Sequence, residues 1–197
     1  MPTFPPKAKP KILPPEGTHI ARVVGFIFIG TVPNEFQGET KMMTKVRITW
    51  ELPEEKHEFK EGDGEKPFTI SEEYTLSLLD NSNLYPIIEG IEGYIPDEVR
   101  DSYDIEKLVG KESLITIKHG KSKKGAMFAK VASTAPLMKG QKAPEAFNPL
   151  RVMNYDDKWD QEYFNGLPQF IREKMETSEE FKKKFGIETV NPDDVPF

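Results

Sequence analysis

The chain of 197 residues carries 27 Lys and Arg against 33 Asp and Glu, which gives a formal net charge of −6. It has no cysteine and three histidines, which excludes disulfides, thiolate metal sites and a cysteine nucleophile and disfavours a zinc enzyme. The longest strongly apolar run, residues 23–30, is far shorter than the roughly 20 residues of a membrane-spanning helix. The Pro- and Lys-rich start has no apolar segment typical of a secretory signal. The sequence therefore indicates a cytoplasmic protein with no membrane contact and no cofactor.

Three strands are predicted in the first part of the chain. Residues 18–29 are rich in β-branched and aromatic residues and follow a Pro- and Gly-containing segment, which favours a first strand. Apolar and polar residues alternate strictly in residues 45–52, the pattern of a half-buried second strand. Residues 68–79 have a similar alternation and predict a third strand.

The following residues predict a helix and two more strands. Weak helical spacing covers residues 97–109, with acidic residues toward the start and Lys107 near the end. Residues 114–119 and 126–133 are predicted strands, joined by a basic, Gly-bounded turn typical of a hairpin. Three strands, a helix and two strands is the order of an OB-fold barrel, in which the face of strands 2 and 3 binds oligonucleotides.

The composition changes beyond Pro136 and places a domain boundary near residue 140. We expect an N-terminal arm at 1–16, an OB-fold domain at 17–140, and a C-terminal extension at 141–197 with a helix and an acidic tip. The helix is predicted at 168–185, with Pro168 at its start; alternatively, Thr177-Ser178-Glu179-Glu180 breaks it and caps a second turn.

A basic stripe lies within the acidic chain. Residues 111–142 hold eight lysines against the single acid Glu112, a local charge of +7. Cations in such a stripe can follow a phosphate backbone and release its counterions, although a solubilising turn explains a Lys-rich hairpin equally well. Further cations are expected on neighbouring strands. The candidate DNA-binding cations are Arg22, Lys45, Arg47, Lys118, Lys121, Lys123, Lys124 and Lys130.

Aromatic residues are interleaved with these cations, as single-strand binding requires, because bases stack on rings while cations hold the backbone. Phe36 lies in the predicted loop between strands 1 and 2, where an aromatic residue has less core to enter. For the others, packing in the core is an open alternative. The stacking candidates are Phe28, Phe36, Trp50, Tyr74 and Phe128.

The last residues are Asp193, Asp194, Val195, Pro196 and Phe197. This ending resembles the acidic tip of bacterial single-stranded DNA-binding proteins. The resemblance implies that the tip docks onto partner proteins of replication and repair, with the Phe ring in an apolar pocket and basic groups on its carboxylate and on the aspartates. With only two consecutive aspartates, the tip is less acidic than is usual in that family.

A second resemblance covers more of the chain. Gly17 to Gly25, Trp50 to Pro53, Ser71 to Leu78 and Leu167 to Ile171 are similar to segments of phage-encoded single-stranded DNA-binding proteins. The resemblance implies an OB-fold protein that coats single-stranded DNA without strong sequence preference during replication or recombination, in the cytoplasm of a bacterial host. The chain lacks the long Gly- and Gln-rich linker of the bacterial proteins, so a homo-oligomer is possible but their homotetramer does not follow.

No catalytic motif is found: the sequence has no G-x-S-x-G, no P-loop and no H-E-x-x-H. We therefore expect a protein that is not an enzyme. Two alternatives remain open. One is an OB-fold adaptor that binds only proteins, and the other is a metal-dependent nuclease that uses carboxylate pairs such as Glu72-Glu73.

Overall fold

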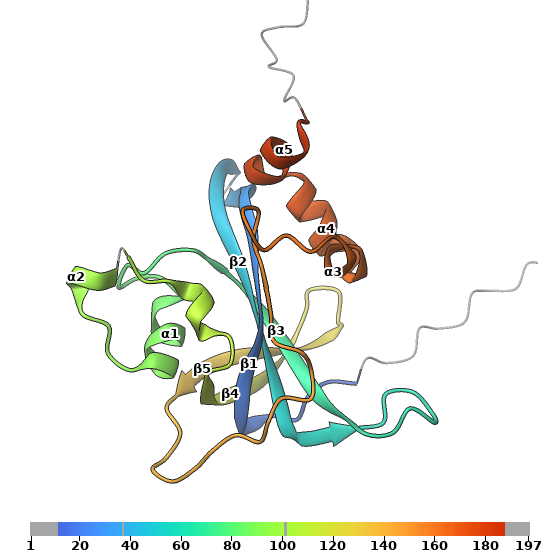
Figure 1. The fold of residues 1–197 in the computed structure, drawn as a ribbon. Helices are drawn as coiled ribbons and strands as arrows, with labels where there is room; N and C mark the ends of the chain where they lie inside the picture. Colours follow the sequence, from blue (N-terminus) through green and yellow to red (C-terminus); the bar gives the residue numbers. More distant parts are fainter. Residues whose placement is uncertain (1–11, 37, 101, 188–197) are drawn as a thin grey trace, which may run out of the picture.

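The structure is a computed structural model that describes residues 12–36, 38–100 and 102–187. In these residues six strands form one mainly antiparallel sheet in the order β3-β2-β1-β4-β5, and β6 pairs in parallel with β1 (Figure 1). The strands are β1 (Gly17–Phe36), β2 (Glu39–His57), β3 (Lys66–Thr75), β4 (Glu112–Lys121), β5 (Met127–Ala135) and β6 (Arg151–Met153). All five predicted strands are thus present, and β1 and β2 are longer than predicted.

The two edge strands of the sheet approach each other. The main-chain N–H of Val131 in β5 donates a hydrogen bond to the carboxylate of Glu72 in β3, at 3.0 Å. In the described part of the chain no main-chain hydrogen bond joins β3 to β5. The sheet is therefore curled but open between β3 and β5, and it does not close into a barrel.

Short helices lie on opposite sides of the strands (Figure 1). Between β3 and β4 the chain forms α1 (Tyr85–Glu92), α2 (Asp97–Arg100) and a 3₁₀ turn, η1 (Ile105–Leu108). The single helix predicted at 97–109 is wrong, because that segment forms only two short turns. The longest helix in this region is α1, with Pro86 in its first turn, where a missing N–H costs no hydrogen bond.

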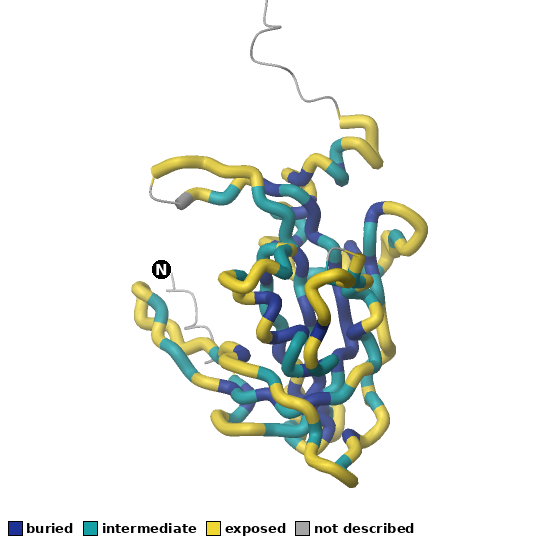
Figure 2. The backbone as a smooth tube through the Cα atoms, turned by 90° about the vertical axis from the view of Figure 1, so that its left-hand side faces the viewer, coloured by how far each residue is buried: buried dark blue, intermediate teal, exposed yellow. Residues whose placement is uncertain are grey.

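The main hydrophobic core fills the inside of the curled sheet beneath α1. The inward side chains of β2, including Ile48, Trp50 and Leu52, are fully buried there together with Ile88 of α1. Figure 2 shows the buried residues gathered along the middle of the molecule and the exposed ones in loops and hairpin ends. The strict alternation of residues 45–52 thus correctly identifies the buried face of β2.

A second core joins the C-terminal segment to the outer face of β1. Ile27, Ile29 and Val32 of β1 are buried against the helices α3 (Gln161–Gly166), α4 (Gln169–Glu176) and α5 (Glu179–Phe185). The single helix predicted at 168–185 is wrong, and the alternative break is confirmed. The Ser178 hydroxyl caps α5 by accepting a hydrogen bond from the N–H of Phe181 at 3.1 Å. The segment predicted as an extension therefore contributes a strand and a core to the fold.

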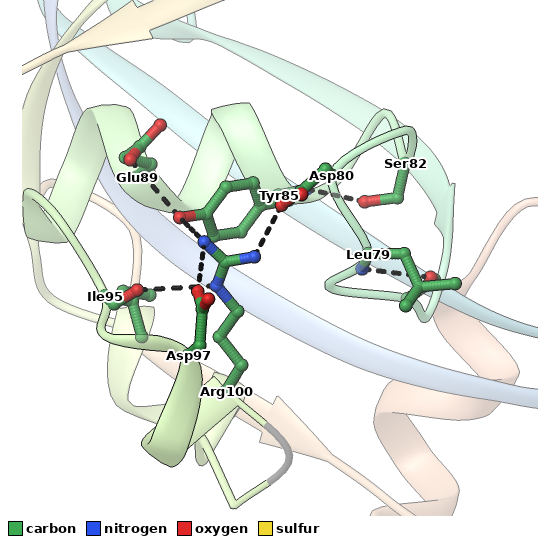
Figure 3. A network of polar contacts seen from close by, with 9 residues as sticks. Leu79, Asp80, Ser82, Tyr85, Glu89, Ile95, Asp97 and Arg100 are labelled. Atoms are coloured by element: carbon green, nitrogen blue, oxygen red, sulfur yellow. Dashed lines mark hydrogen bonds and ion pairs between the residues drawn. The ribbon is translucent and has the colours of Figure 1, made fainter.

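A polar network around Arg100 fixes the loop between β3 and α1 (Figure 3). The Arg100 guanidinium pairs with Asp80 at 2.6 Å and with Asp97 at 2.8 Å. It lies 4.0 Å from the centre of the Tyr85 ring. Ser82 accepts a hydrogen bond from the N–H of Tyr85 at 3.1 Å. These contacts hold the loop and the start of α1 in place beside the sheet.

None of the helices in the described residues is long and apolar enough to cross a membrane.

Candidate nucleic-acid interface

Two cavities follow one another along the opening between β3 and β5, and we call them together the β3–β5 groove. The first, of about 750 Å³, is lined by residues 66–71 of β3 and 127–129 of β5. The second, of about 950 Å³, is lined by residues 72–75 of β3 and 130–134 of β5. The hydrogen bond between Glu72 and Val131 lies where one cavity gives way to the other. We call the first the aromatic cavity and the second the polar cavity.

The aromatic cavity presents phenylalanine rings to solvent. The exposed fractions of Phe59, Phe128 and Phe147 are 46%, 43% and 62%. Phe59 is steadied by an edge-to-face contact with the buried Phe68, with ring centres 5.0 Å apart. Exposed rings that are gathered at one cavity offer flat surfaces on which unpaired bases can stack.

The position of Phe128 depends on the absence of a side chain at Gly120. These residues are cross-strand partners in the β4–β5 hairpin. A Cβ atom at Gly120 would lie 2.6 Å from Cζ of the Phe128 ring, which is far inside van der Waals contact. Glycine therefore lets the ring lie against the β4 main chain while one face stays open to solvent.

Arg47 carries positive charge at the aromatic cavity. Burial lowers the pKa of the Arg47 guanidinium, while the nearby Glu73 and Glu72 raise it. A guanidinium keeps its proton at any ordinary pH. Because screening by water is weaker at a half-buried site, this charge acts more strongly on a bound anion than a surface charge would.

The polar cavity carries three of the predicted cations, Lys45, Lys118 and Lys130. Lys45 donates a hydrogen bond to the Thr75 hydroxyl at 2.8 Å. Burial lowers the pKa of Lys45, opposed by Glu73 and reinforced by Lys174. The structure thus brings lysines from three strands to one cavity beside the exposed rings.

The remaining predicted lysines lie at the tip of the β4–β5 hairpin. Lys121, Lys123 and Lys124 are exposed there. Main-chain hydrogen bonds between Ser122 and both Gly125 and Ala126, each 2.8 Å long, close the turn. The predicted hairpin with a basic tip is therefore confirmed, and it adjoins the groove through Met127 and Phe128.

Four predicted contact residues serve the fold instead, which corrects their assignment to the DNA-binding set. Arg22 pairs with Glu112 at 2.7 Å and donates to the carbonyls of residues 110, 143 and 144. Trp50 and Tyr74 are buried in the main core with exposed fractions of 0% and 8%. Phe28 is half-buried and contacts Tyr155 edge-on, with ring centres 5.9 Å apart. Trp50 and Tyr74 therefore offer no open face to a base.

The remaining predicted site residues are Phe36 and the C-terminal tip. The main chain of Phe36 pairs with Glu39 at the end of the β1–β2 hairpin. The partner-binding tip, Asp193, Asp194, Val195, Pro196 and Phe197, lies outside the described residues.

The structure adds Phe59 and Phe147 to the candidate site. Phe59 is the only aromatic residue in the charged loop between β2 and β3, and the argument applied to Phe36 would have found it. Phe147 is held by the fully buried Glu51, whose carboxylate accepts hydrogen bonds from the N–H groups of Phe147 and Asn148 at 2.8 Å. No sequence signal indicates this contact, because it joins residues 96 positions apart.

The scan against family models finds none that matches the chain, and the search of curated proteins finds no relative. Among residues 12–36, 38–100 and 102–187, no group of three or more His, Asp or Glu side chains is placed to hold a metal ion.

Proposed function

We propose that the protein binds single-stranded DNA without strong sequence preference, through the β3–β5 groove. The observation that carries this proposal is the juxtaposition of the exposed rings of Phe59, Phe128 and Phe147 with lysines of the adjoining cavity and hairpin. Stacking on an aromatic ring contributes about 1–3 kcal/mol per base. Lysines that neutralise phosphates add a salt-dependent attraction that is independent of sequence.

The strand order supports an OB-type fold. The order β3-β2-β1-β4-β5, with the edges β3 and β5 approaching each other, is that of a five-stranded barrel left partly open. In such barrels the face of strands 2 and 3 and the loop between strands 4 and 5 bind oligonucleotides. Arg47 of β2 and the β4–β5 hairpin occupy these positions here.

The net charge of −6 is compatible with this role. The field near a binding surface is set by local charges, since interactions beyond the Debye length of about 8 Å are screened at physiological salt. Local lysines therefore attract a phosphate backbone although the whole chain is acidic. In addition, duplex DNA keeps its base faces stacked, so the exposed rings favour single strands.

We further propose that residues 193–197 recruit proteins of replication, recombination or repair, as the resemblance of this segment to an acidic tip suggests. Deletion of residues 191–197 should abolish such recruitment and leave the affinity for single-stranded DNA at physiological salt intact. Loss of DNA binding in this variant would contradict the division of roles.

The direct test is fluorescence anisotropy of labelled oligothymidine and of a duplex of equal length, titrated with the full chain at several salt concentrations. We expect binding of the single strand alone, with an affinity that falls as salt rises. A gel of the same mixtures with magnesium checks that the strand stays intact. Cleavage of the strand would favour the nuclease, and no binding at low salt would refute the proposal.

Matched variants locate the site. Phe128→Ala should weaken binding about 5- to 150-fold, the factor that corresponds to about 1–3 kcal/mol of stacking. Phe170→Ala is the control, because Phe170 is also an exposed phenylalanine, 62% exposed, but lies on α4 and not in the groove lining. Equal effects of the two substitutions would show that the groove is not the binding site.

A protein-binding adaptor is the second candidate, and one observation favours it. Leu79, Tyr94 and Val99 around α1 and α2 are 69%, 72% and 45% exposed, an apolar surface that DNA binding does not use. The double substitution Lys118→Glu and Lys130→Glu separates the two functions. An adaptor that does not bind DNA would keep its affinity for partner proteins in this variant. A DNA-binding protein should lose most of its affinity for single-stranded DNA.

A further inference from the structure

The lysines of the polar cavity repel one another. Lys118 of β4 and Lys130 of β5 are direct cross-strand partners, and both are exposed. Like charges directly opposite each other destabilise a sheet. Lys45 of β2 adds a third positive charge to the lining of the same cavity. An anion bound in this cavity would relieve the repulsion.

The carboxylates near these lysines are engaged elsewhere. Glu73 of β3 pairs with Lys174 of α4 at 2.7 Å. Glu72 of β3 accepts the hydrogen bond from the N–H of Val131, and burial raises the pKa of its carboxyl group. In the described residues no ion pair joins Lys45, Lys118 or Lys130 to a carboxylate. Glu72 and Glu73 also line the cavity, so its three lysines outnumber its two carboxylates and leave a net positive charge.

The rest of the lining mixes apolar and polar residues, and its one aromatic residue, Tyr74, is buried. Small hydroxyl and amide side chains contribute to it, among them Ser77, Asn81, Asn83 and Ser133. The loop between β3 and α1, which the Arg100 network holds, supplies the first three of these. A nucleobase would find no stacking partner here, whereas a phosphate would find both cations and neutral hydrogen-bond donors.

We infer that the polar cavity is a phosphate-binding pocket, in which Lys45, Lys118 and Lys130 hold a phosphate group of a nucleic-acid strand whose bases stack in the adjoining aromatic cavity. The inference rests on the proposed function for the identity of the strand. Two sources can supply the group: a terminal phosphate monoester or an internal phosphodiester. A terminal phosphate carries about −1.5 to −2 charge at pH 7, so three lysines favour it over a monoanionic diester.

The test compares three oligothymidines of about six nucleotides, within the range that one OB-type fold covers. One has a 5′-phosphate, one a 3′-phosphate and one neither, and each competes with a labelled strand for the full chain. Inorganic pyrophosphate is a fourth competitor. We expect one terminal phosphate to tighten binding about tenfold, the factor that corresponds to about 1.4 kcal/mol.

Two variants separate the pocket from general electrostatics. Lys130→Gln should erase the preference for a terminal phosphate and weaken competition by pyrophosphate. Lys121→Gln removes the same charge from the exposed hairpin tip. This variant should retain the preference for a terminal phosphate and the competition by pyrophosphate. Because both side chains are exposed, neither change is expected to unfold the protein, and thermal unfolding of each variant checks this.

The outcomes are distinguishable. Equal affinities of the three oligonucleotides, with Lys130→Gln weakening all of them more than Lys121→Gln, would assign the pocket to an internal phosphodiester. Equal affinities with equal effects of the two variants, and no competition by pyrophosphate, would overturn the inference while the proposed function stands. Direct binding of pyrophosphate, measured by calorimetry and lost in Lys130→Gln, without any binding of oligonucleotides would overturn the proposed function instead.

Discussion

Glu51 couples the stability of the fold to the shape of the candidate site. Its carboxylate has no exposed surface, and it accepts hydrogen bonds from the main chain of Phe147 and Asn148 and from the Asn148 side-chain amide at 2.6 Å. A buried carboxylate with several donors is stable because its lone pairs are satisfied. The same contacts place the Phe147 ring at the aromatic cavity.

Glu51→Gln should therefore lower both stability and DNA affinity. The Gln amide group presents N–H donors where the structure needs acceptors, and we expect a loss of about 1–3 kcal/mol in the free energy of unfolding. Urea denaturation measures this change. Glu54→Gln is the matched control, because Glu54 is exposed on the same strand, and it should alter stability by less than about 0.5 kcal/mol. Equal effects would contradict the role of Glu51.

Glu72 gives the fold a specific pH dependence. Burial raises the pKa of its carboxyl group above the ordinary value of 4.5, against the hydrogen bond from Val131 and the charges of Arg47 and Lys130. The folded state then binds this proton more tightly than the unfolded state. The stabilisation is complete below the ordinary pKa and is lost as the pH rises through the raised one.

Glu72→Gln removes this titration and retains an oxygen that can accept the hydrogen bond from Val131. Relative to this variant, the wild-type protein should lose thermal stability as the pH rises from about 4 to about 8. Unfolding midpoints across that range measure the difference. A difference between the two proteins that does not change with pH would contradict the buried, raised carboxyl group.

At the scale of elements, Gly30 permits α5 to pack on β1. Its φ is +99°, in the region that side chains rarely adopt, and it lies at an irregularity of the β1–β2 pairing. A Cβ atom there would lie 2.7 Å from Cβ of Ser178 and 2.6 Å from the Glu180 carboxylate. That carboxylate accepts hydrogen bonds from the N–H and the hydroxyl of Thr31 at 2.6 and 2.8 Å.

Gly30→Ala should thus strain β1 and push α5 away from the sheet. The unfavourable φ alone costs about 1–3 kcal/mol, and the overlap with Ser178 adds to it. Gly166→Ala is the control, since a Cβ atom at Gly166 would meet nothing within 4 Å. Thermal unfolding compares the two variants. A stable Gly30→Ala protein would mean that α5 does not approach β1 as closely as the structure has it.

Local patterns in the sequence predict the strands well and the helices poorly. Alternation identifies the buried face of β2, but the strand continues through Pro53, beyond its predicted end. Proline has no N–H to donate to a neighbouring strand, and here it lies in an irregularity of the β2–β3 pairing between Leu52 and Lys56. In α1, Pro86 and Gly90 look like turn residues. Gly90 is needed because β5 packs against it, where a Cβ atom would lie 2.1 Å from the Thr134 hydroxyl.

The candidate site could be predicted only where its residues are close in sequence or share a strand. The basic hairpin and Phe128 follow from the pattern of residues 114–133, and Lys45 and Arg47 follow from the polar face of β2. The alternation of β2 likewise places Trp50 on the buried face. In contrast, the place of Phe147 depends on a contact between distant segments. Such contacts arise from packing, which composition and periodicity do not specify.

At the scale of the whole molecule, the C-terminal segment and the sheet share buried surface. Ile27, Ile29 and Val32 of β1 are covered by α3–α5, and residues 147–148 satisfy the carboxylate of Glu51. Each such apolar side chain contributes roughly 1.5–3 kcal/mol when it is buried. A typical domain has a free energy of unfolding of only about 5–15 kcal/mol, so this shared surface is a large part of the total.

Truncation after residue 140, at the boundary that composition indicates, should therefore not leave a stable DNA-binding domain. We expect an aggregation-prone or unfolded chain, because the outer face of β1 becomes exposed and Glu51 loses its donors. Truncation after residue 187 retains every described element and is the control. Circular dichroism and thermal unfolding of the two fragments distinguish the outcomes. A folded 1–140 fragment that still binds oligothymidine would mean that α3–α5 are an appendage to the sheet, and that the groove does not depend on Phe147.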